Sequence, residues 1–398
     1  MSSSEQHFVT SLPSPASPGP VVIPGSAIGM LGGGQLGRMF ASVARQFGYQ
    51  MQVFGEHSSS PAGQLADRSW PATFTDRDQL KEFAERVSVV TLEQENIPVE
   101  TIQFLEQYVP VHPSAELLRA SQHRLLEKTS LRSIGIPTAD FLPIRTAREL
   151  KEGLAEFGGT GILKTVTMGY DGKGQARLAA NTDCNAVWSE FAVPEAILER
   201  EIEFDFELSV VAGRFMDGSV VCYQPSVNHH VNHILDVSVA PSPLISEQIS
   251  REASAIAGAI LEHFNAYGVL CVEFFLTTSG KLLVNEIAPR PHNSGHLTID
   301  ACASSQFEQQ LRAVCGMSSG DVQQRRPAAM INLLGEHLQN ATPERWQAVF
   351  AMSDVHVHMY GKSEARTGRK MGHITATADS AQHAELLARR ARAVLMGQ

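Results

Sequence analysis

A short apolar run followed by an amphipathic segment opens the patterned part of the chain. Residues Ala27–Leu31 are mostly apolar and lead into a glycine-rich turn at residues 32–37, after which apolar positions recur at helical spacing to residue 47. A second apolar run, Gln50–Phe54, follows a stop at Gly48. This order predicts a strand, a helix and a second strand, the β-α-β unit with which a parallel sheet begins.

The same periodicities predict the other elements. Strands are expected where apolar and β-branched residues cluster, at residues 87–91, Gly161–Thr165, 176–179, 196–201, 207–212, 219–224, 329–334, 355–360 and 372–378. Helices are expected where apolar residues recur every three or four positions, at residues 114–135, 146–157, 246–264, 305–314 and 380–396. The polar residues 318–326 indicate a linker, and the Ser- and Pro-rich residues 1–22 predict a disordered tail.

A hairpin is predicted near the middle of the chain. Two runs rich in β-branched and aromatic residues, 268–276 and 281–287, flank a tight turn at Ser279 and Gly280. If those two residues form the loop, the register of the two strands follows from it.

In that register, Glu273 lies directly opposite Glu286, with their Cβ atoms ~5 Å apart. Two carboxylates so close repel each other, and either a shared proton or a divalent cation would offset the repulsion. Magnesium is favoured because it prefers hard oxygen ligands and accompanies nucleotide phosphates. The alternative is a solvated edge hairpin with both acids in water.

Polar side chains crowd the segment that follows this hairpin. They are Asn285, Arg290, His292, Asn293, Ser294 and His296. Such a loop contributes little to a core, and polar groups at the end of a strand are where binding and catalysis usually occur.

Two other strand ends carry candidate chemistry. The glycine turn at residues 32–37 matches GxGxxG, with Glu56 near the position of a ribose-binding acid, so a dinucleotide, a phosphorylated substrate or a purely structural turn all remain open. After residues 87–91 come Glu93 and Asn96, which would bind a ligand or, for Asn96, cap the next helix.

Lys164 lies inside an apolar strand and is followed by the loop MGYDGKGQ at residues 168–175. A buried ammonium needs a partner, for which a phosphate is suited, and glycine-dense loops can fold over phosphates as a lid. The loop is not a Walker A motif, because no Ser or Thr follows its lysine. A flexible hairpin is the alternative.

Three further segments are polar. Acids at the end of residues 196–201 would hold adenine and ribose, and the histidines of residues 228–233 predict a polar loop facing the site in preference to a zinc site. Residues 361–370 contain a cluster of cations, which indicates an anion-binding loop or a solvated hairpin tip.

Composition narrows the class of protein. The 398 residues are 43% hydrophobic and can bury two or three cores. No apolar run of ~20 residues is present, so no membrane partner is expected. The five cysteines lack CxxC spacing, which suits reduced thiols in the cytoplasm. A net charge of −10 argues against a nucleic-acid partner.

Five motifs resemble those of one family. They are GGGQLGRM at residues 32–39, PAGQLAD at 61–67, MGYDGKGQ at 168–175, NEIAPRPHNSGH at 285–296 and YGKSEARTGRKMGHI at 360–374. Together they are similar to the 5-(carboxyamino)imidazole ribonucleotide synthase family of the ATP-grasp superfamily, and the likeness spans nearly the whole chain after the tail.

The resemblance implies an α/β fold with the mixed α+β architecture of ATP-grasp enzymes. Its expected parts are an N-terminal Rossmann-like domain with a parallel sheet at residues 23–125, a central two-lobed ATP-grasp domain at 126–322 with a lid at about 140–212, and a small β-rich C-terminal domain at 323–398.

The resemblance also implies ATP-dependent carboxylation of 5-aminoimidazole ribonucleotide by bicarbonate, through carboxyphosphate, in de novo purine biosynthesis, by a homodimer that uses ATP and Mg²⁺. The implied ATP contacts are Arg124, Lys164, Gly169, Tyr170, Asp171, Gly172, Lys173, Gly174, Gln175, Glu199, Arg200, Glu201, Ile202, Glu207, His230, Asn285 and Glu286. The implied catalytic residues are Tyr170, Asp171, Arg290, His292 and Asn293, and the metal ligands are Glu273 and Glu286. The implied ribonucleotide contacts are Gln35, Leu36, Glu93, Asn96, Lys362, Arg369 and Lys370.

Three other functions remain as alternatives. One is another ATP-grasp ligase, such as a formate-dependent glycinamide ribonucleotide transformylase or a biotin carboxylase, although residues 360–374 argue against it. The second is an oxidoreductase with NAD at the glycine turn. The third is an inactive nucleotide-binding regulator, against which the two acids and Lys164 argue.

Overall fold

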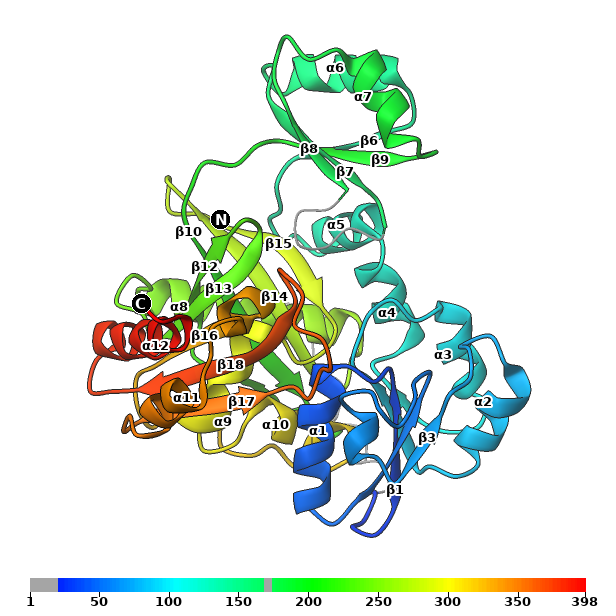
Figure 1. The fold of residues 1–398 in the computed structure, drawn as a ribbon. Helices are drawn as coiled ribbons and strands as arrows, with labels where there is room; N and C mark the ends of the chain where they lie inside the picture. The colour runs from blue at the N-terminus through cyan, green and yellow to red at the C-terminus, as the bar shows by residue number, and fades with distance from the viewer. Residues whose placement is uncertain (1–20, 168–173) are drawn as a thin grey trace, which may run out of the picture.

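The computed structural model describes residues 21–167 and 174–398 (Figure 1). Nearly all of the expected tail, and the expected ATP contacts Gly169, Tyr170, Asp171, Gly172 and Lys173, lie outside the described residues. In the described ranges no helix is both long enough and apolar enough to cross a membrane.

The N-terminal sheet is parallel, as the β-α-β pattern predicts. In the described chain its five strands run in the order β3-β2-β1-β4-β5. They are β1 Ala27–Leu31, β2 Gln50–Phe54, β3 Arg68–Trp70, β4 Val89–Leu92 and β5 Val111–His112. Helices α2 Arg77–Ala84 and α3 Val99–Leu105 pack on one face, and α1 Gln35–Gln46 packs on the other. Both β1 and β4 therefore end at the same edge of the sheet, next to Gly32 and Glu93.

The single helix predicted at residues 114–135 is wrong. Two helices, α4 Ala115–Ser121 and α5 Arg124–Ser133, are separated at His123, whose backbone is extended and whose ring accepts a hydrogen bond from the N–H of Leu126. The side chain of Gln122 donates to the carbonyls of Glu95 and Ile97 instead of continuing the helix. Apolar periodicity continues through the break, so the pattern alone did not reveal it.

Helix α3 begins without the cap considered for it. Its first flanking residue is Pro98, which has no side chain able to accept a hydrogen bond, and Asn96 lies further upstream. The helix-cap alternative for Asn96 is therefore wrong, and this side chain remains available to the cleft described below.

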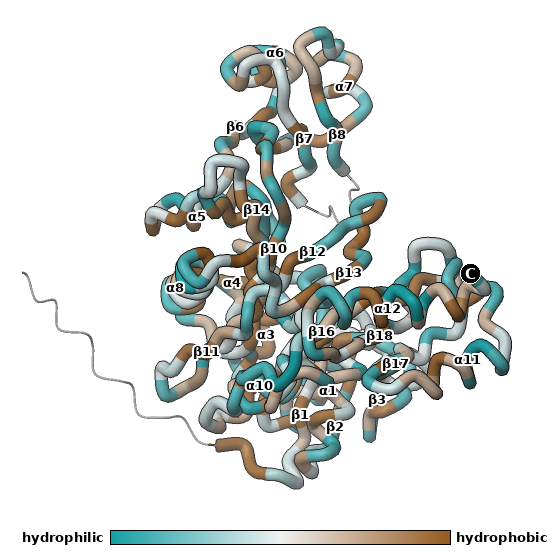
Figure 2. The backbone as a smooth tube through the Cα atoms, turned by 90° about the vertical axis from the view of Figure 1, so that its left-hand side faces the viewer, coloured by the Kyte–Doolittle hydropathy of each residue, from teal (hydrophilic) through white to brown (hydrophobic). Residues whose placement is uncertain are grey.

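A small lobe projects from the body of the molecule, as both views show (Figures 1 and 2). Among the described residues it contains four antiparallel strands, in the order β6-β9-β7-β8. They are β6 Phe141–Ile144, β7 Gly161–Thr165, β8 Gln175–Leu178 and β9 Ala196–Glu199, and they are covered by α6 Ala147–Glu156 and α7 Cys184–Phe191. This sheet accounts for residues 141–199 of the expected lid at 140–212.

The large sheet joins the central and C-terminal parts of the chain. In the described residues it has nine strands, ordered β15-β14-β10-β12-β13-β16-β18-β17 with β11 beside β10. They are β10 Phe204–Arg214, β11 Val220–Cys222, β12 Ser226–Val231, β13 Ile234–Ala240, β14 Gly268–Thr277, β15 Leu282–Ala288, β16 Ala328–Leu334, β17 Val355–Met359 and β18 Lys370–Thr377. Because β13 pairs with β16, the C-terminal strands extend the sheet of the central part.

Helices bury both ends of this sheet. Helix α8 Glu247–His263 packs its alanine-rich stripe on β10 and β14, and α12 Ala381–Met396 packs on β16 and β18. Helix α10 Gln306–Val314 lies between β14 and α1, so it connects the large sheet to the N-terminal sheet. The predicted architecture, a parallel N-terminal sheet followed by a two-lobed central part and a β-rich C-terminal part, is confirmed.

The segment predicted as a polar loop at residues 228–233 faces the cleft described below, as expected, but most of it is a strand, so the loop conformation is wrong. Asn228, His229 and His230 belong to β12, and the turn is formed by Asn232 and His233, whose φ values are 50° and 65°. Polar residues are tolerated in this strand because alternate side chains point to opposite faces, and Asn228 is buried among other polar groups.

Candidate functional site

A cleft of about 1580 Å³ lies where the two sheets of the body meet the small lobe, and most of the expected site residues line it. Those that line it are Gln35, Leu36, Glu93, Asn96, Arg124, Lys164, Gln175, Glu199, Glu207, His230, Glu273, Asn285, Glu286, Arg290, His292, Asn293, Lys362, Arg369 and Lys370. Among the described residues, Gly174, Arg200, Glu201 and Ile202 are expected contacts that do not line it.

Glu273 pairs directly with Glu286, as the hairpin register predicts. The turn that led to this prediction is nevertheless wrong. The N–H of Thr277 donates to the carbonyl of Lys281 at 2.9 Å, so the loop contains three residues and ends at Gly280, with φ 79°. A three-residue loop shifts the register by one, which alone would have separated the two acids.

A β-bulge at Asn285 restores the pairing. Phe274 pairs with Val284, yet the preceding residue of β14, Glu273, pairs with Glu286, so Asn285 is the extra residue. Its carbonyl accepts a hydrogen bond from the ammonium of Lys128 at 3.1 Å. The bulge thus turns both an acid and a carbonyl toward the cleft.

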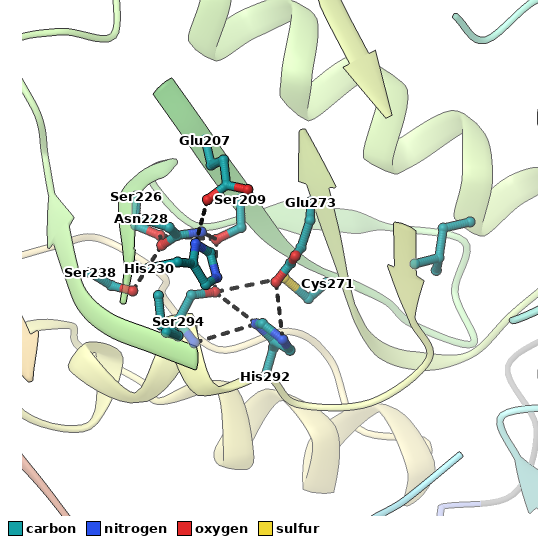
Figure 3. Close-up of polar contacts among 12 residues, drawn as sticks. Glu207, Ser209, Ser226, Asn228, His230, Ser238, Cys271, Glu273, His292 and Ser294 are labelled. Atoms are coloured by element: carbon teal, nitrogen blue, oxygen red, sulfur yellow. Dashed lines mark hydrogen bonds and ion pairs between the residues drawn. The ribbon is translucent and has the colours of Figure 1, made fainter. Parts of the chain in front are cut away.

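The two facing carboxylates of Glu273 and Glu286 repel each other. Burial, and then the negative charge of Glu286, raise the pKa of Glu273 to about 8. Nε2 of His292 lies 3.2 Å from a Glu273 oxygen, and Figure 3 shows this ring beside the carboxylate. A divalent cation would relieve the repulsion between the acids, so these hard oxygen donors fit magnesium. No cluster of three or more His, Cys, Asp or Glu suited to a metal occurs in the described chain, so phosphate oxygens and water would complete the coordination.

Lys164 has a protein partner, which the sequence did not indicate. Its ammonium lies 2.6 Å from Glu199, and Lys128, only 1% exposed, lies 3.4 Å from the same carboxylate. Burial raises the pKa of Glu199, but the two lysines lower it to about 2 overall. The inference that Lys164 needs a phosphate as its partner is therefore wrong, although a phosphate can still approach it from the cleft.

Two buried residues of α5 were missed. Lys128 faces Glu199, and Glu127 accepts a hydrogen bond from the N–H of Ile287 at 3.1 Å. Burial raises the pKa of Glu127 to about 8. Glu127 and Lys128 lie three and four residues after Arg124, so they share a face of the helix with this expected site residue. That spacing was the signal in the sequence that could have identified them.

The glycine turn is partly occupied by a side chain of the protein. Glu93 accepts hydrogen bonds from the N–H groups of Gly34 at 2.8 Å and Gly37 at 3.3 Å, at the N-terminus of α1. A Cβ at Gly34 would lie 2.6 Å from a Glu93 oxygen, so a side chain here would displace the Glu93 carboxylate from the turn. The turn therefore has a structural role. In the described chain, no group accepts a hydrogen bond from the N–H of Gln35 or Leu36.

Arg290 is bound by an acid that the sequence analysis did not select. Its Nε and Nη2 donate to the two carboxylate oxygens of Glu95 at 2.5 and 2.8 Å. Burial raises the pKa of Glu95, but Arg290 lowers it to below its usual value. The only signal in the sequence was its place in the polar segment after β4.

The basic loop between β17 and β18 divides into two parts. Lys362, Arg369 and Lys370 line the cleft, and the ammonium of Lys362 donates to the carbonyl of Lys370 at 2.7 Å. Burial, and then the charge of Arg369, lower the pKa of Lys362 to about 8. Arg366 pairs with Glu364 at the exposed tip. This loop is thus both a solvated tip and a cationic wall of the cleft.

Some of the residues expected to contact adenosine line the cleft, and others do not. His230 is hydrogen-bonded to Glu207 inside the cleft (Figure 3). The side chain of Arg200 instead lies 3.1 Å from Asp140, and that of Glu201 pairs with Arg177 at 2.6 Å. The side chains of Arg200 and Glu201 therefore point away from the cleft.

Family models match most of the chain. The ribonucleotide synthetase preATP-grasp domain matches residues 26–122, the ATP-grasp domain matches residues 129–307, and the phosphoribosylaminoimidazole carboxylase C-terminal domain matches residues 328–386. The three matches follow one another in the same order as the three parts of the fold.

Whole-chain comparisons agree with these matches. An N5-carboxyaminoimidazole ribonucleotide synthase of Bacillus subtilis is 38% identical over 357 residues, which cover 89% of this chain and 92% of that protein. The bifunctional purine synthesis protein purC/E of Dictyostelium discoideum is 40% identical over 377 residues, and the match covers 89% of this chain but 37% of that longer protein.

Solved structures resemble the fold closely. An N5-carboxyaminoimidazole ribonucleotide synthetase in complex with ADP has a TM-score of 0.88 and 37% identity, covering 94% of this chain and 97% of that one. An N5-carboxyaminoimidazole synthase of Aspergillus clavatus, in complex with ADP and 5-aminoimidazole ribonucleotide, has a TM-score of 0.84 and 29% identity, covering 94% and 99%.

Proposed function

Because the chain belongs to the N5-carboxyaminoimidazole ribonucleotide synthase family of ATP-grasp ligases, we propose that it uses ATP to join bicarbonate to the amine of 5-aminoimidazole ribonucleotide. The products are N5-carboxyaminoimidazole ribonucleotide, ADP and phosphate. Within this proposal the protein acts as a homodimer, which light scattering of the purified protein tests.

One observation carries the proposal: the facing acids share one cleft with two groups of cations. Glu273 and Glu286 line the same cleft as Lys164 on the small lobe and Lys370 on the C-terminal strands. A triphosphate and a sugar phosphate each need positive charge, and here two cationic regions, on different parts of the chain, line the same cleft as the acidic pair. This arrangement suits a phosphoryl transfer between two anionic substrates.

ATP would bind between the small lobe and the large sheet. Lys164 and Arg124 face the cleft where its phosphates would lie, and Glu207 with His230 would contact the nucleoside. Magnesium held by Glu273 and Glu286 would neutralise phosphate charge, which is what phosphoryl transfer mainly requires. Glu199 keeps Lys164 in place, because their contact at 2.6 Å is buried.

The ribonucleotide phosphate would rest on the opposite wall. Lys362, Arg369 and Lys370 supply positive charge there, and the N–H groups of Gln35 and Leu36 supply donors at the start of α1. Glu93 and Asn96 would contact the sugar or base in the same region.

Bicarbonate would lie between these two anions. Arg290, whose guanidinium is oriented by Glu95, and Asn293 line the cleft beside the acidic pair. They would hold bicarbonate, and then carboxyphosphate, in a region from which water is partly excluded. The proposed roles of Tyr170 and Asp171 concern residues outside the described chain.

The test measures ADP formation with each pair of substrates. We expect ADP formation that depends on both bicarbonate and 5-aminoimidazole ribonucleotide, and we expect the carboxylated product to appear with it. ADP formation with formate and glycinamide ribonucleotide instead would assign the chain to the transformylase reaction. Absorbance changes with NAD and no ADP formation would indicate an oxidoreductase.

A further inference from the structure

A chain of buried polar side chains lies beneath the acidic pair, and the proposed reaction does not by itself require it. It runs from Asn228 on β12 through Ser209 on β10 and Ser294 to the ring of His292 (Figure 3). Ser209, Asn228 and Ser294 are 2%, 4% and 1% exposed. Burying polar groups is costly, so a fully hydrogen-bonded chain of this kind imposes a specific arrangement on its members.

The direction of each hydrogen bond follows from Asn228. Its side-chain oxygen accepts from Ser238 at 2.8 Å, and its side-chain nitrogen donates to Ser209 at 2.9 Å. Ser209 donates its one hydroxyl proton to Ser294 at 2.7 Å. Because the Ser294 oxygen accepts that proton, its own proton is directed to Nδ1 of His292, which is 2.9 Å away.

A longer backbone contact favours the same state of His292. The N–H of Ser294 also approaches Nδ1, at 3.4 Å, and a backbone amide can only donate. Nδ1 is therefore an acceptor, and in the neutral ring the proton lies on Nε2. Nε2 is the atom that faces Glu273 at 3.2 Å.

We propose that this chain of three side chains holds His292 in its Nε2–H tautomer and thereby fixes the direction of the Glu273 carboxylate. With its proton on Nε2, the ring presents a donor 3.2 Å from one oxygen of Glu273, which would leave the other oxygen to face Glu286 and a cation. In the opposite tautomer, a nitrogen lone pair would face the carboxylate and repel it. Asn228, Ser209 and Ser294 are thus positioning residues, since they act through the imidazole.

This inference revises the role expected for His292. The ring was expected to handle carboxyphosphate or carbon dioxide directly, whereas both of its nitrogens are engaged within the protein. Its involvement with a cation rests on the proposed function. Its tautomer does not, because the hydrogen bonds that determine it are formed without any ligand.

Nitrogen NMR of the metal-free protein, labelled with ¹⁵N-histidine, tests the tautomer. The His292 signals are identified by their absence from a His292→Gln variant. We expect the chemical shift of an unprotonated nitrogen at Nδ1 and of a protonated nitrogen at Nε2. A protonated Nδ1 in the wild-type protein overturns the proposal.

Two matched variants separate the hydrogen-bond chain from packing. Ser209 and Ser226 lie directly opposite each other on β10 and β12 and are 2% and 5% exposed, so replacing either by alanine removes one buried hydroxyl. Ser209 donates directly to Ser294 at 2.7 Å, whereas Ser226 lies one step off this path: it donates to the Asn228 oxygen at 3.3 Å, and its hydroxyl lies 3.1 Å from that of Ser209. The Asn228 oxygen keeps its shorter bond from Ser238.

Ser209→Ala and Ser294→Ala should therefore move the two nitrogen shifts of His292 toward each other, as exchange between tautomers does. Ser226→Ala should leave them unchanged, and Ser209→Thr, which keeps the hydroxyl, should restore the wild-type pattern. Equal changes in the Ser209→Ala and Ser226→Ala variants, or no change in Ser294→Ala, overturn the proposal.

Manganese binding gives a second readout. In the presence of ADP, electron paramagnetic resonance should show Mn²⁺ bound several-fold more weakly by Ser294→Ala than by Ser226→Ala. Equal affinities contradict the part of the proposal that concerns Glu273. A wild-type protein that forms no ADP with bicarbonate would instead remove the proposed function and leave the tautomer result in place.

Discussion

Arg290 and Glu95, 195 residues apart in the sequence, form a two-point ion pair across the cleft. Glu95 comes after strand β4 of the N-terminal sheet, and Arg290 comes after strand β15 of the large sheet. The pair therefore connects the two sheets of the body. The guanidinium plane is fixed by both bonds, which orients its remaining N–H groups. This pair connects the architecture of the protein to the position proposed for bicarbonate.

Glu95→Gln should impair the use of bicarbonate. A glutamine keeps the shape but loses the charge and one acceptor, and charge-assisted hydrogen bonds contribute about 1.5–3 kcal/mol. We expect kcat/KM for bicarbonate to fall about tenfold or more, which corresponds to about 1.4 kcal/mol. Steady-state kinetics at saturating ATP measure it. Glu85→Gln, on the exposed surface of the same sheet domain, is the control. Wild-type kinetics in Glu95→Gln would show that Arg290 needs no such support.

Glu286→Ala should reduce ATP turnover about a hundredfold while preserving the fold. Glu286 is exposed at the end of β15, and exposed substitutions usually change stability by less than about 0.5 kcal/mol. Loss of one metal carboxylate should cost about 3 kcal/mol in the transition state, or about a hundredfold in rate. ADP release and thermal unfolding measure the two effects, with Glu262→Ala as the control. Unchanged turnover would refute the metal assignment.

Lys370→Ala should weaken binding of the ribonucleotide far more than binding of ATP. Lys370 lines the cationic wall of the cleft, and loss of a charge-assisted contact with a phosphate costs about 1.5–3 kcal/mol. We expect the KM for the ribonucleotide to rise about tenfold or more, with little change in the KM for ATP. Arg366→Ala, on the same loop but paired with Glu364 at its tip, should change neither. Equal increases for both substrates would contradict the assignment.

The buried carboxylate of Glu199 should make stability depend on pH in the acid range. Its pKa is about 2, below the usual 4.5, because Lys128 and Lys164 outweigh its burial. A lowered folded-state pKa contributes stability that is present above about pH 4.5 and is lost as the pH falls toward 2. The contribution is roughly 3 kcal/mol at neutral pH.

Urea unfolding at pH 7 and pH 3 measures this contribution. Glu199→Gln should lose stability at pH 7, because Lys128 and Lys164 lose their counterion, and should differ less from the wild type at pH 3. Glu247→Gln, an exposed acid on α8, is the control and should match the wild type at both values. If Glu199→Gln lowered the free energy of unfolding by the same amount at pH 7 and at pH 3, the lowered pKa assigned to Glu199 would be contradicted.

The hairpin shows how far local pattern reaches. The strands around Glu273 and Glu286 were readable because β-branched and aromatic residues cluster there, and their pairing was predicted. The prediction was correct although its turn was wrong, because the bulge at Asn285 compensates for the longer loop. A bulge depends on what the extra residue contacts, here Lys128 at 3.1 Å, and that contact spans 157 residues.

The periodicity of the chain determined the strands β1, β2 and β7 and the order of the three parts, since apolar spacing reports which face of an element is buried. Motifs determined the family and the expected site residues, most of which line the cleft. Tertiary structure alone decided three relationships. Glu95 binds Arg290, Glu199 binds Lys164, and Asn228 is connected to His292 by hydrogen bonds between side chains. Those relationships join residues that no local pattern relates, because the partner of a buried polar group is selected by distance and desolvation in the folded chain.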